Sequence, residues 1–202
     1  MARMLPIVAA LLGAMWLAGP AAAQHTLTGE LPRPGAASQP VVLVAGASGR
    51  TGRHVVEQLA ASGNYRVRAM TRDPSAADLP RGPAITWVAG DVTQPGTLRE
   101  PAAGATYVVS TIGATERSGP NGPEFVDYRG VASLAEAGRT AGAAQFVLVS
   151  SMGVESGGGF VGWILNLVGG DVLEWKAKGE QALRDSGVPY TIIRPGGLTD
   201  GA

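Results

Sequence analysis

The chain has 202 residues, enough for one domain, and 45% of them are hydrophobic while only 16% are charged, as in a globular protein with a sizeable core. Sixteen basic and sixteen acidic residues cancel, so the charge gives no reason to expect a nucleic acid or an anionic membrane surface as partner. The absence of cysteine excludes disulfides and thiolate chemistry, and two histidines far apart in the sequence predict no metal site.

Residues 1–23 have the pattern of a secretory signal, with a basic residue near the start, an apolar core and a final Ala-Ala-Ala. The core of about 15 residues is shorter than the roughly 20 that span a bilayer, so we expect cleavage and no membrane span in the mature chain. This predicts an exported protein, periplasmic or secreted. Nicotinamide nucleotides are kept inside cells, however, so a cytoplasmic protein with a start further downstream is the alternative. Residues 24–40, rich in Pro and Gly, are predicted to be a flexible linker.

The stretch from Val41 to Gly52, VVLVAGASGRTG, is an apolar run that leads into three glycines. The run suits a strand buried on both faces, and apolar residues recur at helical spacing after Gly52. Strand, glycine turn and helix form the layout of a dinucleotide phosphate site, in which backbone N–H groups and the positive helix end favour the pyrophosphate. The spacing G-x-x-G-x-x-G is looser than the commoner G-x-G-x-x-G, and glycine turns occur in many folds, so the flanking elements carry this interpretation.

Further strands and helices alternate along the rest of the chain. Strands are predicted over residues 65–70, 85–89, 106–110, 145–149 and 190–193, and helices over residues 123–142 and 171–186. This alternation predicts an α/β fold, a single doubly wound parallel-sheet (Rossmann) domain over residues 41–202. The apolar, glycine-rich residues 157–170 suit either a lid or a short packing helix.

Polar residues at the strand ends indicate which nucleotide would bind, because ligands of such sheets lie beyond the carboxyl ends of the strands. Arg72 follows the second strand, where an NAD site usually has an acidic residue that binds the ribose. An arginine can instead bind a 2′-phosphate, and Arg50 adds a second positive charge, so NADP is favoured over NAD. Both arginines could also be solvated surface residues. Asp91 suits the adenine amino group better than a metal, since no second carboxylate accompanies it.

The chain resembles the atypical short-chain dehydrogenase/reductase family, which has NAD(P)-binding Rossmann domains. The matching segments are VLVAGASGRTGRHVVEQL, GDV, STIGA, FVDYRGVASLAEA, FVLVSSMGV and EWKAKGEQALRDSGVPYTIIRPGGL. The last is similar to the branch that contains the NADP-binding component of the chloroplast inner-envelope import machinery and its soluble plant and bacterial relatives. The resemblance extends from Val41 to Leu198.

The resemblance implies a set of cofactor-binding residues. For the pyrophosphate these are Gly46, Ser48, Gly49, Arg50, Thr51 and Gly52, and for the 2′-phosphate Arg72. Adenine would be bordered by Asp91 and Val92, and the ribose and nicotinamide by Thr111, Ile112, Gly113, Lys176, Ser150 and Pro195.

The resemblance also implies a catalytic set with one departure. In the wider superfamily a Ser positions the carbonyl, a Tyr passes the proton and a Lys lowers the pKa of that Tyr. Ser151 and Lys176 match the Ser and Lys, but Val172 stands where the Tyr belongs. Core packing is expected for Tyr128 and Tyr190. The branch generally lacks this Tyr, and it includes NADPH-dependent reductases of flavins or quinones and members that use the nucleotide as a redox signal.

The resemblance implies a further substrate-covering segment after Leu198, whereas the sequence stops at Ala202, so we expect a domain truncated at its C-terminal end. Three interpretations stay open. The first is an NADP(H)-binding oxidoreductase that transfers hydride to a small unidentified substrate. The second is a non-catalytic, nucleotide-responsive binding or assembly protein, and the third is a truncated pseudoenzyme.

Overall fold

The computed structural model describes residues 39–76, 78–154, 171–196 and 198. The predicted signal, most of the predicted linker and the predicted lid or packing helix over residues 157–170 lie outside the described residues. The sheet has six parallel strands, which are β1 (Val41–Ala45), β2 (Arg66–Thr71), β3 (Ile85–Ala89), β4 (Tyr107–Ser110), β5 (Gln145–Val149) and β6 (Tyr190–Ile193). The helical elements are α2 (Arg50–Ala61), η1 (Pro95–Thr97), α3 (Arg99–Ala102), η2 (Glu124–Gly130), α4 (Val131–Thr140) and α6 (Val172–Asp185).

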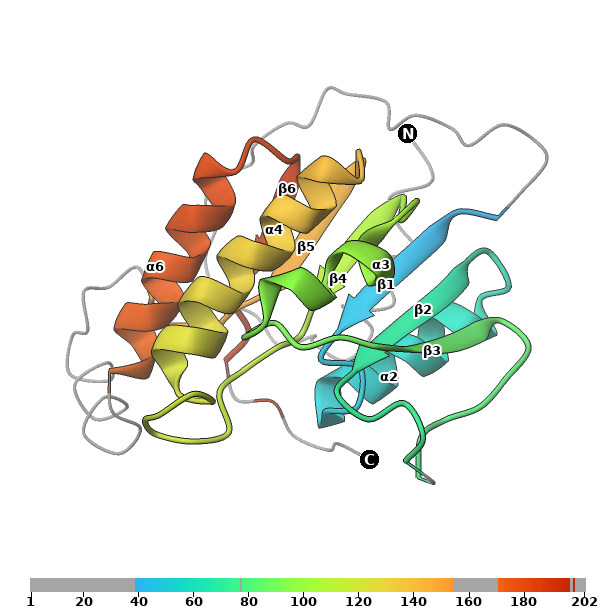
Figure 1. Ribbon diagram of the computed structural model, residues 1–202, viewed down its shortest axis with the longest axis horizontal. Coiled ribbons are helices and arrows are strands. Elements are labelled where there is room, and N and C mark those ends of the chain that lie inside the picture. The colour runs from blue at the N-terminus through green and yellow to red at the C-terminus, as the bar shows by residue number, and fades with distance from the viewer. Residues whose placement is uncertain (1–38, 77, 155–170, 197, 199–202) are drawn as a thin grey trace.

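The strands lie in the order β3-β2-β1-β4-β5-β6, so the chain starts at the centre of the sheet and moves outward to β3 before it returns to β4 (Figure 1). The direction of winding therefore reverses between β1 and β4. In open α/β sheets, ligands bind in the crevice at this reversal. The predicted α/β fold, a doubly wound parallel sheet, is confirmed.

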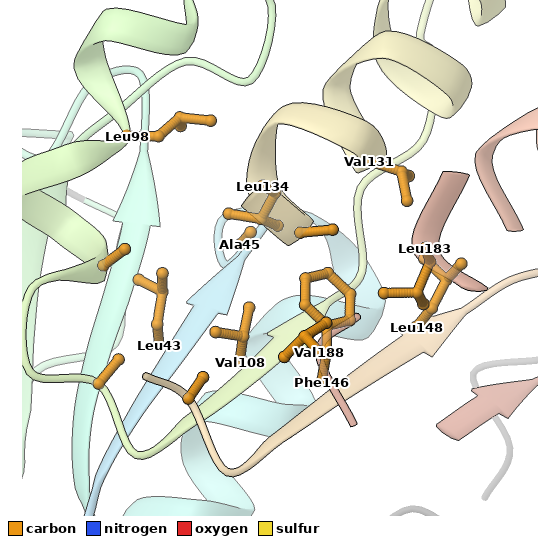
Figure 2. Close-up of a cluster of buried hydrophobic side chains, with 14 of the residues drawn as sticks. Leu43, Ala45, Leu98, Val108, Val131, Leu134, Phe146, Leu148, Leu183 and Val188 are labelled. Carbon is orange, nitrogen blue, oxygen red and sulfur yellow. The ribbon is translucent and has the colours of Figure 1, made fainter. Parts of the chain in front are cut away.

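The central strand β1 is apolar along its whole length, as expected for a strand with helices on both faces of its sheet. Val42 and Val44 of β1 pack in a cluster with apolar residues of α2, whereas Leu43 and Ala45 point to the opposite face. There they join a second cluster with residues of α3, α4 and α6, in which Phe146 is fully buried (Figure 2). This alternation fixes the register of β1, and with it the position of the glycines that follow.

The helical stretch predicted over residues 123–142 differs from an ordinary α-helix at its start. Residues Glu124–Gly130 form a π-helix, which continues into α4. A π segment is rare and widens the helix locally, and such segments are frequent at functional sites. The side chain of Asp127 lies within this segment and is 2% exposed.

The two tyrosines expected in the core lie elsewhere. Tyr190 opens the edge strand β6 and is 39% exposed, so the expectation of core packing was wrong for this residue, which lies at the margin of the sheet. Tyr128 is half-buried and stacks on Trp175 of α6 at a ring-centroid distance of 6.1 Å. Among the described helices, none combines the length and the apolar character that a membrane span requires.

Candidate functional site

A cavity of about 180 Å³ lies beyond the carboxyl ends of β1, β2, β3 and β4, where the sheet reverses its winding. It brings together most residues predicted to bind a dinucleotide. Those that line it are Gly46, Ser48, Gly49, Arg72, Asp91, Val92, Thr111, Ile112 and Gly113. Residues at the same cavity that the sequence did not single out include Thr71, Thr93, Thr115 and Asn121.

The glycines of the loop after β1 are required by its geometry. Gly46 has a φ of 76°, in the left-handed region, and a Cβ there would lie 2.9 Å from the carbonyl carbon of Thr111. A Cβ on Gly52 would lie 2.1 Å from the carbonyl oxygen of Gly46. Gly52 therefore lets the first turn of α2 pack directly on the loop.

The start of α2 is arranged to receive an anion. Gly49 precedes the helix in an extended conformation and provides no side-chain cap, and the first turn contains no acidic residue. Backbone N–H groups of this turn have no partner within the helix, and the helix dipole makes this end positive. Arg50 and Thr51 belong to this turn, although neither lines the cavity. The hydroxyl of Ser48 lies at the cavity, 3.1 Å from the Thr71 hydroxyl. This donor set fits the pyrophosphate of a dinucleotide.

Arg72 lies at the rim of the same cavity and is exposed. Its Nη1 donates to Oδ1 of Asn121 at 3.2 Å, and the amide of Asn121 donates to Glu116 at 3.0 Å. The loop after β4 thus reaches across to the end of β2. Arg53 of α2 is bound to Asp78 and to the backbone oxygen of Ser48, so it ties the loop after β2 to the glycine loop.

Asp91 lines the cavity beyond β3, and much of its bonding capacity is already used. Its Oδ1 accepts hydrogen bonds from the backbone N–H and the hydroxyl of Thr93, at 2.9 and 2.8 Å. The carboxylate therefore shapes the turn after β3, and Oδ2 is bonded only weakly, by Gln94 at 3.5 Å. Within the described part of the chain, no three potential ligand side chains are grouped to hold a metal ion.

A second, small cavity of about 10 Å³ shares Ile112 with the first and extends toward β5 and α6. Lys176 and Ser150, both predicted from the resemblance, line it together with Asp127, which the sequence reasoning missed. The Lys176 ammonium donates to Oδ1 of Asp127 at 2.6 Å, and Oδ2 of Asp127 accepts from the backbone N–H of Ala114 at 3.2 Å. Asp127 therefore holds both the lysine and the loop after β4.

The close packing of α6 on η2 makes this ion pair possible. Gly179 lies one turn after Lys176, and a Cβ there would lie 2.0 Å from the carbonyl oxygen of Asp127. The sequence did contain one signal for Asp127. It precedes Val131 and Leu134 by four and seven residues, which places an acidic side chain on the buried face of the predicted helix.

The two serines after β5 differ in their surroundings. Ser150 is 8% exposed, lines the small cavity and donates its hydroxyl to Oε1 of Glu180 at 2.6 Å. Ser151 lines neither cavity, and its hydroxyl lies 3.3 Å from the carbonyl oxygen of Met152. Pro195 is buried and also lies outside both linings, and its carbonyl oxygen accepts from the N–H of Met152 at 2.9 Å.

Val172, at the place of the superfamily tyrosine, is half-buried at the first position of α6. The described lining of the small cavity contains no tyrosine. Lys178 lies at the surface. It is exposed, pairs with Glu174 at 2.7 Å and lies 3.9 Å from the ring centroid of Trp175.

Comparisons with known proteins agree with this geometry. A family model described as NAD(P)H-binding matches residues 46–202. The chloroplast protein TIC 62 of Oryza sativa is 35% identical over 177 residues, and the match covers 78% of this chain and 35% of that protein. Sanguinarine reductase of Eschscholzia californica is 31% identical over 196 residues, with 80% of this chain and 70% of that protein covered.

The fold also has solved counterparts. The crystal structure of the oxidoreductase ylbE from Lactococcus lactis superposes with a TM-score of 0.70 at 22% identity, over 80% of this chain and 71% of that one. The chain spans about a third of the length of the TIC 62 proteins that it matches. It belongs to the NAD(P)H-binding, oxidoreductase-like family of atypical short-chain dehydrogenases/reductases.

Proposed function

We propose that this protein binds NADP(H) and acts as an oxidoreductase that moves hydride between the nicotinamide and a small acceptor. The observation that carries the proposal is the cavity at the reversal of the sheet, with the glycine loop at one end and the Lys176–Asp127 pair beside the other. When bound, the nicotinamide supplies or accepts the hydride. The loop and the start of α2 bind the phosphates, while Lys176 offers a positively charged donor beside the reacting end.

Valine in place of the superfamily tyrosine limits which chemical classes of substrate can accept the hydride. Val172 has no proton to give, and a simple carbonyl needs an acid as it takes up hydride. Flavins and quinones can take hydride together with a proton from solvent, and they fit a site without a tyrosine. The similarity to sanguinarine reductase supports a reductase, without indicating which acceptor it uses.

The same valine supports a second candidate, a protein that binds the nucleotide and responds to it without turnover. Titration with NADPH, followed by nicotinamide fluorescence and by thermal shift of the chain from Gln24 onward, comes first. We expect saturable binding and a raised melting temperature. Oxidation of NADPH in the presence of quinones or flavins would then support the reductase, and binding without turnover would support the second candidate. A folded protein that does not bind NADPH would contradict both.

The preference for NADP over NAD is proposed to depend on Arg72. Reversing its charge with Arg72→Glu should weaken NADPH binding at least tenfold, because a charge-assisted bond to phosphate contributes about 1.5–3 kcal/mol. NADH, which lacks the 2′-phosphate, should lose much less. Calorimetric titration with both nucleotides measures the two effects.

A matched control for Arg72→Glu is available on β2, the strand that Arg72 follows. Arg66 is exposed at the opposite end of β2, about 20 Å away at 3.3 Å per residue. Arg66→Glu makes the same change in net charge and should leave both affinities almost unchanged. Equal losses of NADPH and NADH affinity in Arg72→Glu would contradict the assignment of the 2′-phosphate to this arginine.

A further inference from the structure

The hydroxyl of Ser150 is engaged by a buried carboxylate. Glu180 of α6 is 1% exposed, and its Oε1 accepts from Ser150 Oγ at 2.6 Å. Arg194 donates to both of its oxygens, at 2.9 and 2.6 Å, and Arg184 donates to Oε2 at 3.0 Å. Four hydrogen bonds therefore converge on one carboxylate, directly behind the small cavity.

These contacts fix the direction of the Ser150 hydrogen bond. Burial alone would raise the pKa of Glu180, but the hydrogen bonds from Arg194 and Ser150 outweigh it and lower the pKa below its ordinary value. At neutral pH the carboxylate is therefore ionised and can only accept. Because a serine hydroxyl has one hydrogen, Ser150 gives that hydrogen to Glu180 and keeps lone pairs for any other partner.

Lys176 lines the same cavity and supplies a hydrogen-bond donor, whereas Ser150 supplies an acceptor. Lys176 and Glu180 are four residues apart on α6 and so lie on one face of the helix. An ammonium has three hydrogens and no lone pair, and one of them is given to Asp127. The cavity thus presents an acceptor from β5 and a donor from α6. A small planar group that both donates and accepts, such as a primary carboxamide, is complementary to this pair.

We propose that Ser150 accepts a hydrogen bond from the carboxamide N–H₂ of a bound nicotinamide, which makes it a residue that recognises the cofactor. The proposal rests on the NADP(H) binding proposed above. It assigns Ser150 a role different from the serine of the wider superfamily, because a hydroxyl that already donates to Glu180 has no hydrogen left to stabilise the oxygen of a substrate carbonyl. Lys176 is then the donor that the described lining offers to such an oxygen.

The test compares NADP⁺ with its 3-acetylpyridine analogue, in which a methyl group replaces the amide N–H₂ and the carbonyl oxygen stays. Calorimetric titration of the wild-type chain should show NADP⁺ binding about 3- to 10-fold more tightly, the effect of one neutral hydrogen bond. In Ser150→Ala the ratio of the two dissociation constants should fall to about one. If Ser150→Ala only damaged the fold, both ligands would bind more weakly and the ratio would keep its wild-type value. The ratio therefore distinguishes the loss of this hydrogen bond from damage to the fold.

Two variants act as controls. Ser151→Ala, at the neighbouring serine outside the cavity lining, should keep the wild-type ratio, and Ser150→Thr, which keeps a hydroxyl, should restore it. Equal affinities in the wild type, or a wild-type ratio in Ser150→Ala, would overturn the assignment while NADP⁺ binding itself still stands. If the folded wild type binds neither dinucleotide, the proposed function and this assignment fall together.

Discussion

Replacing Gly52 by alanine is expected to abolish tight NADPH binding and to lower the free energy of unfolding by about 1–3 kcal/mol. A Cβ at this position would lie 2.1 Å from the Gly46 carbonyl oxygen and 2.8 Å from the Cα of Ala47. Both are backbone atoms, so no side-chain rotation relieves the overlap, and the loop must move away from the first turn of α2. Because loop and turn together form the proposed phosphate site, we expect the dissociation constant to rise at least tenfold, about 1.4 kcal/mol.

Urea unfolding and NADPH titration of the same preparation measure the two effects of Gly52→Ala. Gly96 offers a matched control, since a Cβ there has no atom within 4 Å and its φ is not in the left-handed region. Gly96→Ala should leave both stability and affinity close to wild type. If Gly52→Ala bound NADPH as tightly as the wild-type chain, the phosphate site could not lie between this loop and this helix.

The parts of the site that follow from local sequence were predictable. The loop from Gly46 to Gly52 was predicted from the apolar strand before it and the amphipathic helix after it. A strand, a tight turn and a helix are all specified by nearby residues. Arg72 followed from position alone, since the end of the second strand of a doubly wound sheet lies beside the first.

The groups behind the small cavity depend on contacts between distant segments. Asp127 meets Lys176 across 49 residues, and Glu180 meets Ser150 across 30, and no local pattern specifies either pair. The π-helix that contains Asp127 packs closely on α6 at Gly179, a contact that helical periodicity does not reveal.

The alternation of side chains along β5 could have predicted which of the two serines after this strand faces α6. Phe146 and Leu148 pack in the same cluster as Leu183 of α6, and Ser150 continues their alternation past the end of the strand. Its side chain is therefore directed to the α6 side, where Glu180 lies, whereas Ser151 is directed away. The resemblance alone, without this alternation, favoured Ser151 as the catalytic serine.

Glu180→Gln is expected to lower the free energy of unfolding at pH 7 by about 3 kcal/mol, the lower part of the range for one partner removed from a buried ion pair. Arg194 and Arg184 would lose the negative charge that they pair with. The N–H₂ group of the new amide would also face the N–H groups of these arginines, so donor would meet donor. The side chains of these arginines are 22% and 32% exposed, so some of the loss is recovered by hydration. The loss should also depend on pH. Since the pKa of Glu180 is lowered on folding, its contribution is complete above the unfolded-state pKa of about 4.3 and disappears as the pH falls through the folded-state pKa.

Urea unfolding from pH 7 down to pH 3 measures this dependence for both proteins. The free energies of unfolding of the wild type and Glu180→Gln should differ most at neutral pH and converge in acid, because protonation of Glu180 removes in the wild type the charge that the substitution removes in the variant. Glu136→Gln is the control: Glu136 pairs with Arg139 on the surface, where solvent screens the pair, so little change is expected at any pH. A constant difference between wild type and Glu180→Gln across this range would mean that the ionised carboxylate does not stabilise the fold, and it would also remove the reason why Ser150 must donate its hydrogen.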